Sequence, residues 1–177
     1  IFDKRILAED SDLKLFFGND WNCNYDIFSY GHDIEASWLL HEAAQVLGDK
    51  AVLAKVEERI PSIVAAATEG FTPEGGMIYE KCGEEIDGDR HWWVQAEASV
   101  GYFNLWEQFG AGEGLENALH CWEFIKAGLI DRENGEWFWS VRADGTVNRD
   151  DDKAGFWKCP YHNSRMCLEI IERTATI

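Results

Sequence analysis

The feature that most restricts the fold is a helical spacing of apolar residues that recurs along the chain. Between residues 31 and 47, apolar side chains fall at positions 34, 38, 39, 43 and 46, and Gly48 follows as a stop signal. Residues 50–68, 91–109 and 115–127 repeat the spacing, and a fifth helix is expected to begin near Asn163. Pro61 is expected to kink or divide the second helix. The sequence therefore predicts a repeat of helical hairpins.

Long polar segments separate these predicted helices. They cover residues 72–90 and 131–160, and each contains a short strand-like run followed by Gly-rich or Asp-rich turn residues. We therefore expect short β-hairpins in these loops. Loops longer than about 15 residues in a compact fold are usually functional, so the two segments are expected to form the walls of a binding site.

The number of repeated hairpins indicates how much of a domain the chain contains. A helical hairpin cannot bury both of its faces alone, so it must stack on its neighbours or close into a ring. The sequence thus predicts an all-α toroid of hairpins. Two and a half hairpins make less than half of a typical ring, so residues 1–177 are expected to be only part of a single domain.

Charge and cysteine content narrow the choice of partners. The chain carries 33 acidic and 16 basic side chains, and its formal net charge of −17 disfavours nucleic acid and anionic lipid surfaces. Every apolar stretch is shorter than the roughly 18 residues that a membrane helix needs. The five cysteines lack a C-x-x-C pair, which indicates neither a disulfide framework nor a zinc site. We expect a cytoplasmic protein with neither nucleic-acid nor membrane partners.

The first candidate site lies in the motif YGHDIEASW, at the start of a predicted helix. His32 and Glu35 are three residues apart, so they share one helix face and can act together in proton transfer. The alternative is a helix start with an exposed ion pair. A metal site is disfavoured, because neither H-E-x-x-H nor a pair of Glu-x-x-His motifs is present. His41 falls on the opposite side of this helix and is expected to be a surface or packing residue.

The second candidate site lies in the motif RHWWVQAEA. Trp93 and Glu97 are four residues apart and share one stripe of the predicted helix, whereas His91 points away from it. An indole offers a broad apolar face to the C–H groups of a sugar ring, and a carboxylate accepts hydrogen bonds from sugar hydroxyls. The alternative is a core tryptophan beside a solvated glutamate.

The third candidate site lies in KAGFWKCPYHNSRMCLE, where Pro160 rigidifies the entry to the last helix. His162 is thereby held at a helix start, where residues that follow a long loop can reach a cleft. A structural histidine is the alternative. The residues placed at or near helix starts after long loops, and hence expected on one rim, are His32, Trp93, Glu97, Trp157 and His162.

Four blocks of the sequence resemble the cellobiose 2-epimerase branch of the N-acylglucosamine 2-epimerase family. They are YGHDIEASWLL, HWWVQAEA, NGEWFWSV and KAGFWKCPYHNSRMCLEI, and they follow the family's order and approximate spacing over nearly the whole chain. The resemblance implies an (α/α)6 barrel, of which residues 1–177 would be the C-terminal half, with the N-terminal half missing. It also implies catalysis without a metal or a redox cofactor.

The same resemblance implies a reaction and its residues. The reaction would be epimerisation at C2 of the reducing-end glucose of cellobiose and related β-1,4-linked disaccharides, giving glucosyl-mannose through a cis-enediolate. His32 and His162 would be the acid/base pair, and Glu35 and Glu97 would assist them. The sugar-binding side chains would be Trp93, Trp157 and Trp92.

The same residues are compatible with other functions. The same family includes N-acylglucosamine 2-epimerase and aldose–ketose isomerase activities, and Glu35 with Glu97 could instead be the carboxylate pair of a glycoside hydrolase on a similar toroid. A carbohydrate-binding fragment without activity is the alternative that is not an enzyme. The family's N-terminal half should supply an arginine and a further histidine to the site. Either that half or self-association would then complete the ring.

Overall fold

The computed structural model describes residue 7 and residues 11–175, and within them the chain is mainly helical. Each predicted helix is present; the helices are α1 (Tyr30–Leu47), α2 (Lys50–Thr68), α3 (Trp92–Phe109), α4 (Gly112–Phe124) and α5 (Tyr161–Thr174). A π-helical turn, η2 (Ile125–Leu129), follows α4 directly. Pro61 lies inside α2, which is a single helix, so this residue does not divide the segment. In the described part of the chain, no helix has both the length and the apolar character needed to cross a membrane.

Local signals account for the turn between α1 and α2. Gly48 ends α1 in the left-handed conformation, with φ of 70°, which costs glycine little. Asp49 then caps α2, because its Oδ1 accepts hydrogen bonds from the backbone N–H groups of Ala51 at 2.9 Å and Val52 at 3.3 Å. The first hairpin is thus specified by residues that are adjacent in the sequence.

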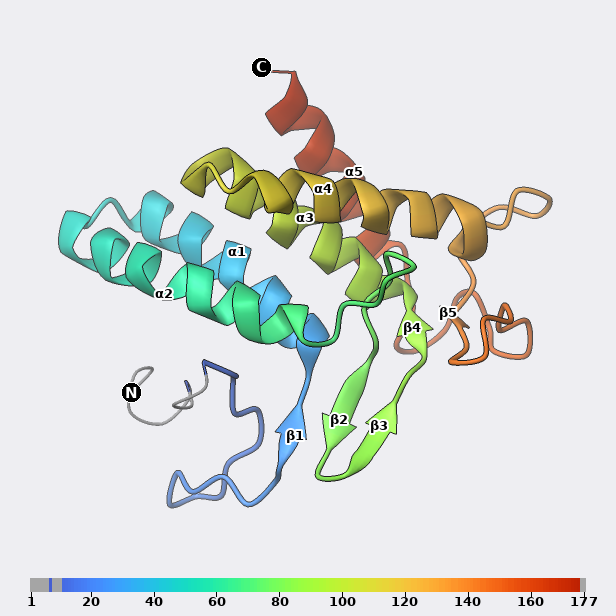
Figure 1. The fold of residues 1–177 in the computed structure, drawn as a ribbon, viewed down its shortest axis with the longest axis horizontal. Helices are drawn as coiled ribbons and strands as arrows, with labels where there is room; N and C mark the ends of the chain where they lie inside the picture. The colour runs from blue at the N-terminus through green and yellow to red at the C-terminus, as the bar shows by residue number, and fades with distance from the viewer. Residues whose placement is uncertain (1–6, 8–10, 176–177) are drawn as a thin grey trace.

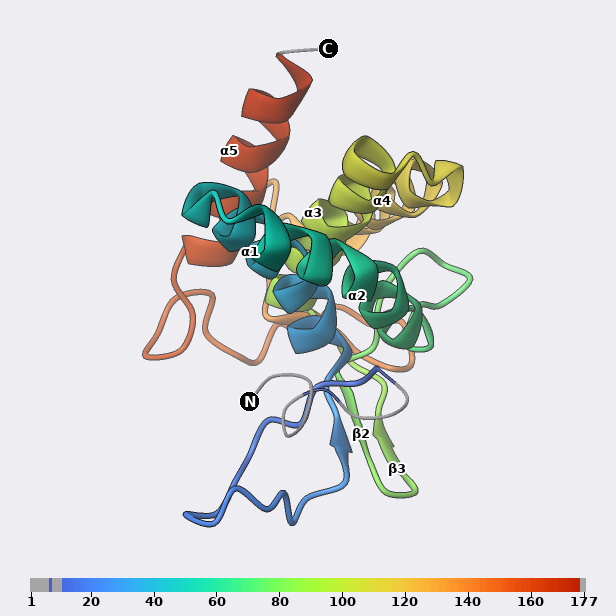
Figure 2. The same ribbon diagram turned by 90° about the vertical axis from the view of Figure 1, so that its left-hand side faces the viewer.

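The central helix of the fold is α3, which packs against α1, α4 and α5 (Figure 1). Its side chains are buried on all sides from Trp92 to Leu105, as expected for a helix enclosed by its neighbours. Gly101 permits the close approach of α1, because a Cβ atom there would lie 2.6 Å from Cγ1 of Ile34. Figure 2 shows α5 projecting beyond the other helices.

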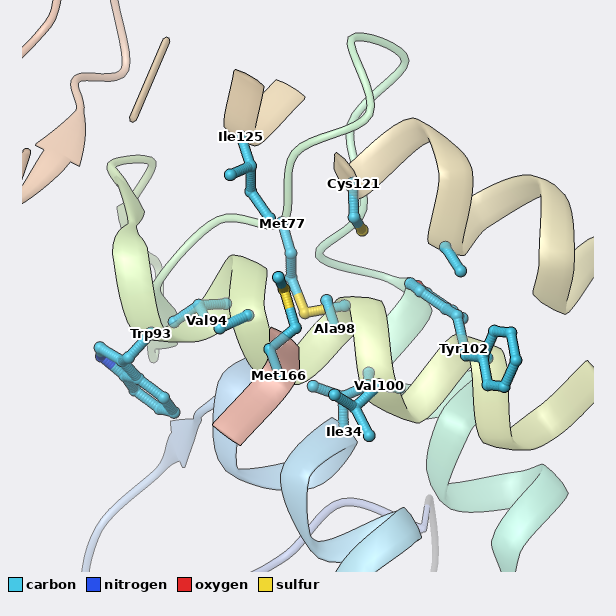
Figure 3. Close-up of a cluster of buried hydrophobic side chains, with 14 of the residues drawn as sticks. Ile34, Met77, Trp93, Val94, Ala98, Val100, Tyr102, Cys121, Ile125 and Met166 are labelled. Carbon is cyan, nitrogen blue, oxygen red and sulfur yellow. The ribbon is translucent and has the colours of Figure 1, made fainter. Parts of the chain in front are cut away.

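Apolar side chains from several elements fix the neighbouring helices on α3 (Figure 3). Ile34 of α1, Met166 of α5 and Met77 of the loop before β2 are buried in the same hydrophobic core as Ala98 of α3. Ile34 is one residue before Glu35, and Met166 is four residues after His162. The same packing that forms the core therefore holds the polar residues near the starts of α1 and α5 in place.

Short strands lie in both predicted long loops, as the sequence predicts, and a further strand lies outside them, before α1. An antiparallel sheet has the order β1-β2-β3 and consists of β1 (Ile27–Phe28), β2 (Glu80–Cys82) and β3 (Glu85–Asp87). A second ladder pairs β4 (Arg90–His91) with β5 (Ser140–Val141). β1 leads into α1 and β4 leads into α3 (Figure 1), so both ladders lie beside helix starts.

A buried lysine anchors the long loop that leads into α5. The side chain of Lys158 is fully buried, and its Nζ donates hydrogen bonds to the carbonyl oxygens of Trp137 at 2.7 Å and Lys153 at 2.9 Å. Oε1 of Glu136 lies 3.3 Å from this ammonium group and also accepts a hydrogen bond from Nδ2 of Asn163 at 2.9 Å. Since Asn163 is in the first turn of α5, this network helps to set where that helix starts.

Candidate active site

Glu97 of α3 is the centre of the candidate active site. Its side chain is only 1% exposed, yet both carboxylate oxygens have hydrogen-bond partners. Nε1 of Trp38 donates to Oε2 at 3.0 Å, and Nη2 of Arg165 donates to Oε1 at 2.7 Å. Nδ1 of His162 lies 2.7 Å from the same Oε1. A buried carboxylate without such partners would be costly, so these contacts both stabilise Glu97 and join α1, α3 and α5.

The contact with Glu97 determines which ring nitrogen of His162 can accept a proton. A carboxylate oxygen only accepts hydrogen bonds, so Nδ1 carries the hydrogen and donates it. In the neutral imidazole, Nε2 is then the basic nitrogen. A carboxylate behind a histidine is the arrangement that holds a general base in one tautomer and one orientation.

Arg165 of α5 is part of the site, although the sequence interpretation assigned it no role. Its Nη2 donates a hydrogen bond to Oε1 of Glu35 at 2.6 Å as well as to Glu97. The guanidinium also lies over two aromatic rings, 4.9 Å from the ring centroid of Trp38 and 4.5 Å from that of Tyr161. One cation thus joins two carboxylates and is held between two rings.

One signal in the sequence could have identified Arg165. It follows His162 by three residues, and Glu35 follows His32 by the same number. Residues three apart on a helix share a face. The sequence therefore shows an arginine on the same face as a candidate catalytic histidine, but it does not show the two carboxylate partners of that arginine.

The two candidate catalytic histidines meet at Trp93. Its indole centroid lies 4.9 Å from the imidazole centroid of His32 and 5.6 Å from that of His162. Nδ1 of His32 lies 2.7 Å from the hydroxyl of Ser29, so a partner orients this ring as well. The structure therefore brings together the imidazoles of α1 and α5 around one aromatic side chain of α3.

The position of Trp93 depends on a glycine in α1. A Cβ atom at Gly31 would lie 2.5 Å from Cη2 and 2.7 Å from Cζ3 of the indole, closer than atoms can approach. Tyr79 packs nearly perpendicular to the same indole, with ring centroids 6.2 Å apart. Trp93 is thus confined by its surroundings, and both histidines rest against a ring that has little room to move.

Burial and charge shift the protonation equilibria of two site residues. The pKa of Glu35 is raised, first by burial and second by the negative charge of Glu97; Arg165 and His162 oppose this rise. The pKa of His32 is lowered, first by desolvation and second by the positive charge of His162. A lowered pKa keeps the His32 imidazole neutral at pH 7 and able to accept a proton.

Two tryptophans predicted to bind sugar lie apart from this cluster. Trp157 is 81% exposed in the loop before α5, and its ring lies nearly perpendicular to that of Phe156 at a centroid distance of 5.0 Å. Trp92 is 3% exposed; it packs against Trp139 at 4.6 Å and beneath the ammonium of Lys158 at 5.1 Å. The structure thus places Trp93, but not Trp92, beside the histidines. Sugar contacts of Trp92 and Trp157 remain predictions.

His41 is a packing residue, which confirms one of the two outcomes expected for it. Its side chain is buried, and its ring centroid lies 5.4 Å from that of Phe109. Its Nε2 lies 3.6 Å from Oε1 of Glu57. His41 therefore occupies the opposite side of α1 from the catalytic candidates, as the helical spacing predicts.

The cluster also has donor atoms of the kind that bind metal ions. One ligand atom each from Glu35, Glu97 and His162 lies within 4.8 Å of the others. Nη2 of Arg165 donates to both carboxylates of this group, so a guanidinium already offsets part of their negative charge. A second group with this spacing consists of Asp87, Asp89 and His91, from β3 to β4. Its His91 stacks on Tyr79 with ring centroids 4.1 Å apart, and Tyr79 in turn packs against Trp93.

Comparison with known proteins identifies the family. The sequence model of the N-acylglucosamine 2-epimerase (GlcNAc 2-epimerase) family matches residues 1–165. A cellobiose 2-epimerase of Bacteroides fragilis is 61% identical over 97% of this chain and 44% of that protein. A cellobiose 2-epimerase of Ruminococcus albus is 44% identical over 93% of this chain and 43% of that protein. The chain therefore spans less than half the length of these curated relatives.

Comparison with solved structures points to the same kind of protein as the sequence comparison. The crystal structure of a sugar epimerase from a ruminal bacterium matches with a TM-score of 0.92 at 40% identity, over 97% of this chain and 45% of that chain. The cellobiose 2-epimerases among the structural neighbours are (α/α)6 barrels. The predicted fold class, a partial (α/α)6 barrel, is therefore confirmed. The four sequence blocks, the helical fold and the matches together show that the chain belongs to the N-acylglucosamine 2-epimerase family.

Proposed function

We propose that this chain contributes the catalytic histidines of an isomerase, a 2-epimerase that converts the reducing-end glucose of cellobiose and related β-1,4-linked disaccharides to mannose. The observation that carries the proposal is the meeting of His32 and His162 at Trp93. Each imidazole has a partner at Nδ1, which leaves Nε2 to exchange a proton with the substrate. The high identity to proteins named cellobiose 2-epimerase supports the choice of substrate.

The proposed chemistry needs two proton-transfer groups and no change of oxidation state. After the sugar ring opens, the C2 hydrogen is acidic because it lies next to the aldehyde. One imidazole removes this proton to give a cis-enediolate. Rotation about C2–C3 presents the opposite face, and a proton returns to C2 with inverted configuration. In this scheme Glu97 holds His162 in the tautomer that accepts a proton, and Ser29 orients His32.

The proposed binding of the sugar uses aromatic faces. Trp93 is confined beside both histidines, so it can place the reducing-end ring within their reach. Trp157 is an exposed indole in the loop before α5 and is the candidate for stacking on a second sugar ring. The proposed reaction uses no metal and no redox cofactor, and the five unpaired cysteines fit a reducing, cytoplasmic compartment.

We further propose that residues 1–177 form the C-terminal half of one (α/α)6 barrel and that an N-terminal half completes it. Two apolar grooves of this fold support the proposal. One lies beside α1 and α2 and has a volume of about 510 Å³; the other lies among α3, α4 and α5, with a volume of about 400 Å³. Part of a ring exposes two such edges, and self-association is the alternative way to cover them.

A glycoside hydrolase on a similar toroid is disfavoured by the state of Glu97. Hydrolysis requires two carboxyl groups that flank the scissile bond and can reach its atoms. Glu97 is buried, and its oxygens are occupied by Trp38, Arg165 and His162. Its contacts suit the orientation of a histidine better than a direct approach to a glycosidic oxygen.

The proposal is tested by incubating the longest natural form of the protein with cellobiose in D2O and examining the products by NMR. We expect deuterium at C2 of a glucosyl-mannose product with the glycosidic bond intact. Free glucose without deuterium at C2 would favour hydrolysis, and oligosaccharide binding without any exchange would favour a binding protein.

Single substitutions test the two histidines. His32→Asn and His162→Asn should each reduce C2 exchange by at least about 1000-fold, because each removes a proton-transfer group at the substrate. His41→Asn is the matched control, since His41 lies on the same helix as His32 and packs away from the site. Equal activity of all three variants, measured by the same NMR assay, would refute the assignment.

A further inference from the structure

We infer that Arg165 is a positioning residue that holds Glu35 and Glu97 together as two carboxylates behind His162. The inference rests on the proposed function, because it concerns the same site. In the inferred role, Arg165 does not contact the reacting carbon. It acts through the two glutamates, which come from different helices and have like charge.

The contacts of one nitrogen atom carry the inference. Nη2 of Arg165 donates to Oε1 of Glu35 at 2.6 Å and to Oε1 of Glu97 at 2.7 Å. Nδ1 of His162 is 2.7 Å from Oε1 of Glu97 but 4.0 Å from Oε1 of Glu35. The histidine is thus hydrogen-bonded to one carboxylate only, and the guanidinium joins that carboxylate to the other.

The aromatic rings explain why the guanidinium stays in this place. The flat cation lies over Trp38 and Tyr161, and Nε1 of Trp38 itself donates to Glu97. A planar guanidinium can stack on rings and donate from its edge at the same time, which a lysine ammonium cannot do. The rings therefore fix the direction from which Arg165 reaches the glutamates.

The positive charge and hydrogen bond of Arg165 favour the ionised form of Glu35. The groups that face Glu35 are Glu97 from α3 and Arg165 and His162 from α5. Burial and the charge of Glu97 raise the pKa of Glu35, and the hydrogen bond from Arg165 is the largest effect that opposes this rise. Without the guanidinium, Glu35 would hold a proton at higher pH and could donate it to Oε1 of Glu97. That bond would compete with Nδ1 of His162 for the same oxygen.

Arg173 offers a matched control in the same helix. The side chains of Arg165 and Arg173 are equally exposed, at 16% each. Arg173 contacts Glu169 at 3.2 Å and Glu107 of α3 at 3.4 Å, so it also joins α5 to a carboxylate of α3. Its Nη1 donates to Oδ1 of Asn104 at 3.1 Å, and its guanidinium lies 6.0 Å from the ring centroid of Trp38. Neither carboxylate contacts a candidate catalytic histidine in the described part of the chain. A variant of Arg173 therefore reports the cost of losing an interhelical arginine over the Trp38 ring, while Glu35 and Glu97 keep Arg165 as their donor.

The experiment compares Arg165→Gln, Arg165→Lys and Arg173→Gln in the longest natural form of the protein, with kcat and KM for cellobiose measured across pH. For Arg165→Gln we expect kcat at pH 7 to fall about 100-fold while KM changes less than about threefold. The acidic limb of its pH profile should move to higher pH. Arg165→Lys should recover part of kcat, because it restores the charge but not the planar contacts. Arg173→Gln should leave kcat and the acidic limb unchanged.

A second measurement does not depend on activity. The carboxyl carbon of Glu35 can be followed by 13C NMR in protein labelled at glutamate, with the signal assigned by Glu35→Gln. Its titration midpoint should rise in Arg165→Gln and stay in place in Arg173→Gln. If the wild type shows no C2 exchange but the midpoint rises, the proposed function fails and the positioning role stands.

Three results would overturn the inference. The first is a wild-type kcat in Arg165→Gln. The second is a loss of kcat in Arg173→Gln equal to that in Arg165→Gln. The third is a titration midpoint of Glu35 that is the same in Arg165→Gln as in the wild type, although the wild type catalyses exchange. Should Arg165→Gln fail to fold, Arg165→Lys decides alone. A lowered kcat at unchanged KM then supports the inference, and a wild-type kcat overturns it.

Discussion

At the scale of single residues, Asp33 forms a buried carboxyl pair with Asp12. Asp33 follows His32 and is buried, and its Oδ1 accepts a hydrogen bond from the backbone N–H of Leu13 at 2.9 Å. Burial first, and then the neighbouring Asp12, raise the pKa of Asp33 to about 9. The folded protein therefore holds a proton in this pair at pH values where the unfolded chain has lost it.

This pair predicts how stability depends on pH. Between about pH 4 and 9 unfolding releases the proton of Asp33, so the free energy of unfolding should fall by up to about 1.4 kcal/mol for each pH unit. Asn at this position can donate to Asp12 and accept from Leu13 without any proton to lose. Asp33→Asn should therefore be more stable than the wild type at pH 8, with a weaker pH dependence. Urea unfolding at pH 5, 7 and 9 checks this; identical slopes for both proteins would contradict it.

Gly31 gives a second prediction at this scale. Gly31→Ala places a Cβ atom 2.5 Å from the indole of Trp93, so that ring must shift away from its place between the two histidines. We expect a stability loss of about 1–3 kcal/mol and a fall in kcat of about tenfold or more. The measurements are urea unfolding and C2 exchange.

Two glycines serve as controls for this substitution. Gly112→Ala, at the start of α4, meets no atom within 4 Å and should change neither property. Gly101→Ala clashes with Ile34 at 2.6 Å and should lower stability by a similar amount. Normal activity in Gly31→Ala would show that the site tolerates movement of Trp93.

At the scale of elements, the start of α5 depends on the buried ammonium of Lys158. Lys158→Met keeps the length of the side chain but leaves the carbonyl oxygens of Trp137 and Lys153 without this donor. We expect a loss of about 1–3 kcal/mol and faster amide exchange in residues 153–164, with a lower kcat because His162 begins that helix. Hydrogen exchange and urea unfolding measure both effects.

Lys126→Met is the control for Lys158→Met. Lys126 lies on the surface after α4 and pairs with Glu123 at 2.7 Å. Surface pairs contribute less than about 1 kcal/mol, so this variant should resemble the wild type. Equal effects of the two substitutions would show that the network around Lys158 does not position α5.

At the scale of the whole molecule, substitutions on the exposed face of α5 test whether an N-terminal half completes the barrel. Leu168 and Ile171 on α5 are 60% and 62% exposed in this chain. Aspartate at either position should cost residues 1–177 less than about 0.5 kcal/mol, because the side chain stays in water. In the longest natural form of the protein, the same change should cost about 2 kcal/mol or more if the N-terminal half covers α5. Equal and small costs in both forms would contradict the proposed half barrel at this edge.

The sequence by itself determined the elements and most of the candidate residues. Helical spacing and local stop and cap signals, such as Gly48 and Asp49, act between residues that are close in the chain. The fixed geometry of a helix likewise set His41 apart from the site. It also predicts one face for His32 and Glu35, yet His32 pairs with Ser29 and Glu35 with Arg165. The four motif blocks were sufficient to recognise the family.

Only the tertiary structure decided which of these residues lie together. Glu35, Glu97 and Arg165 lie on three helices far apart in the sequence, and no local spacing could predict that one guanidinium would join the two carboxylates. Trp92 and Trp93 are adjacent in the sequence, yet one packs beneath Lys158 and the other between the histidines. The physical reason is that local sequence sets the face of each helix, whereas long-range packing sets what that face meets.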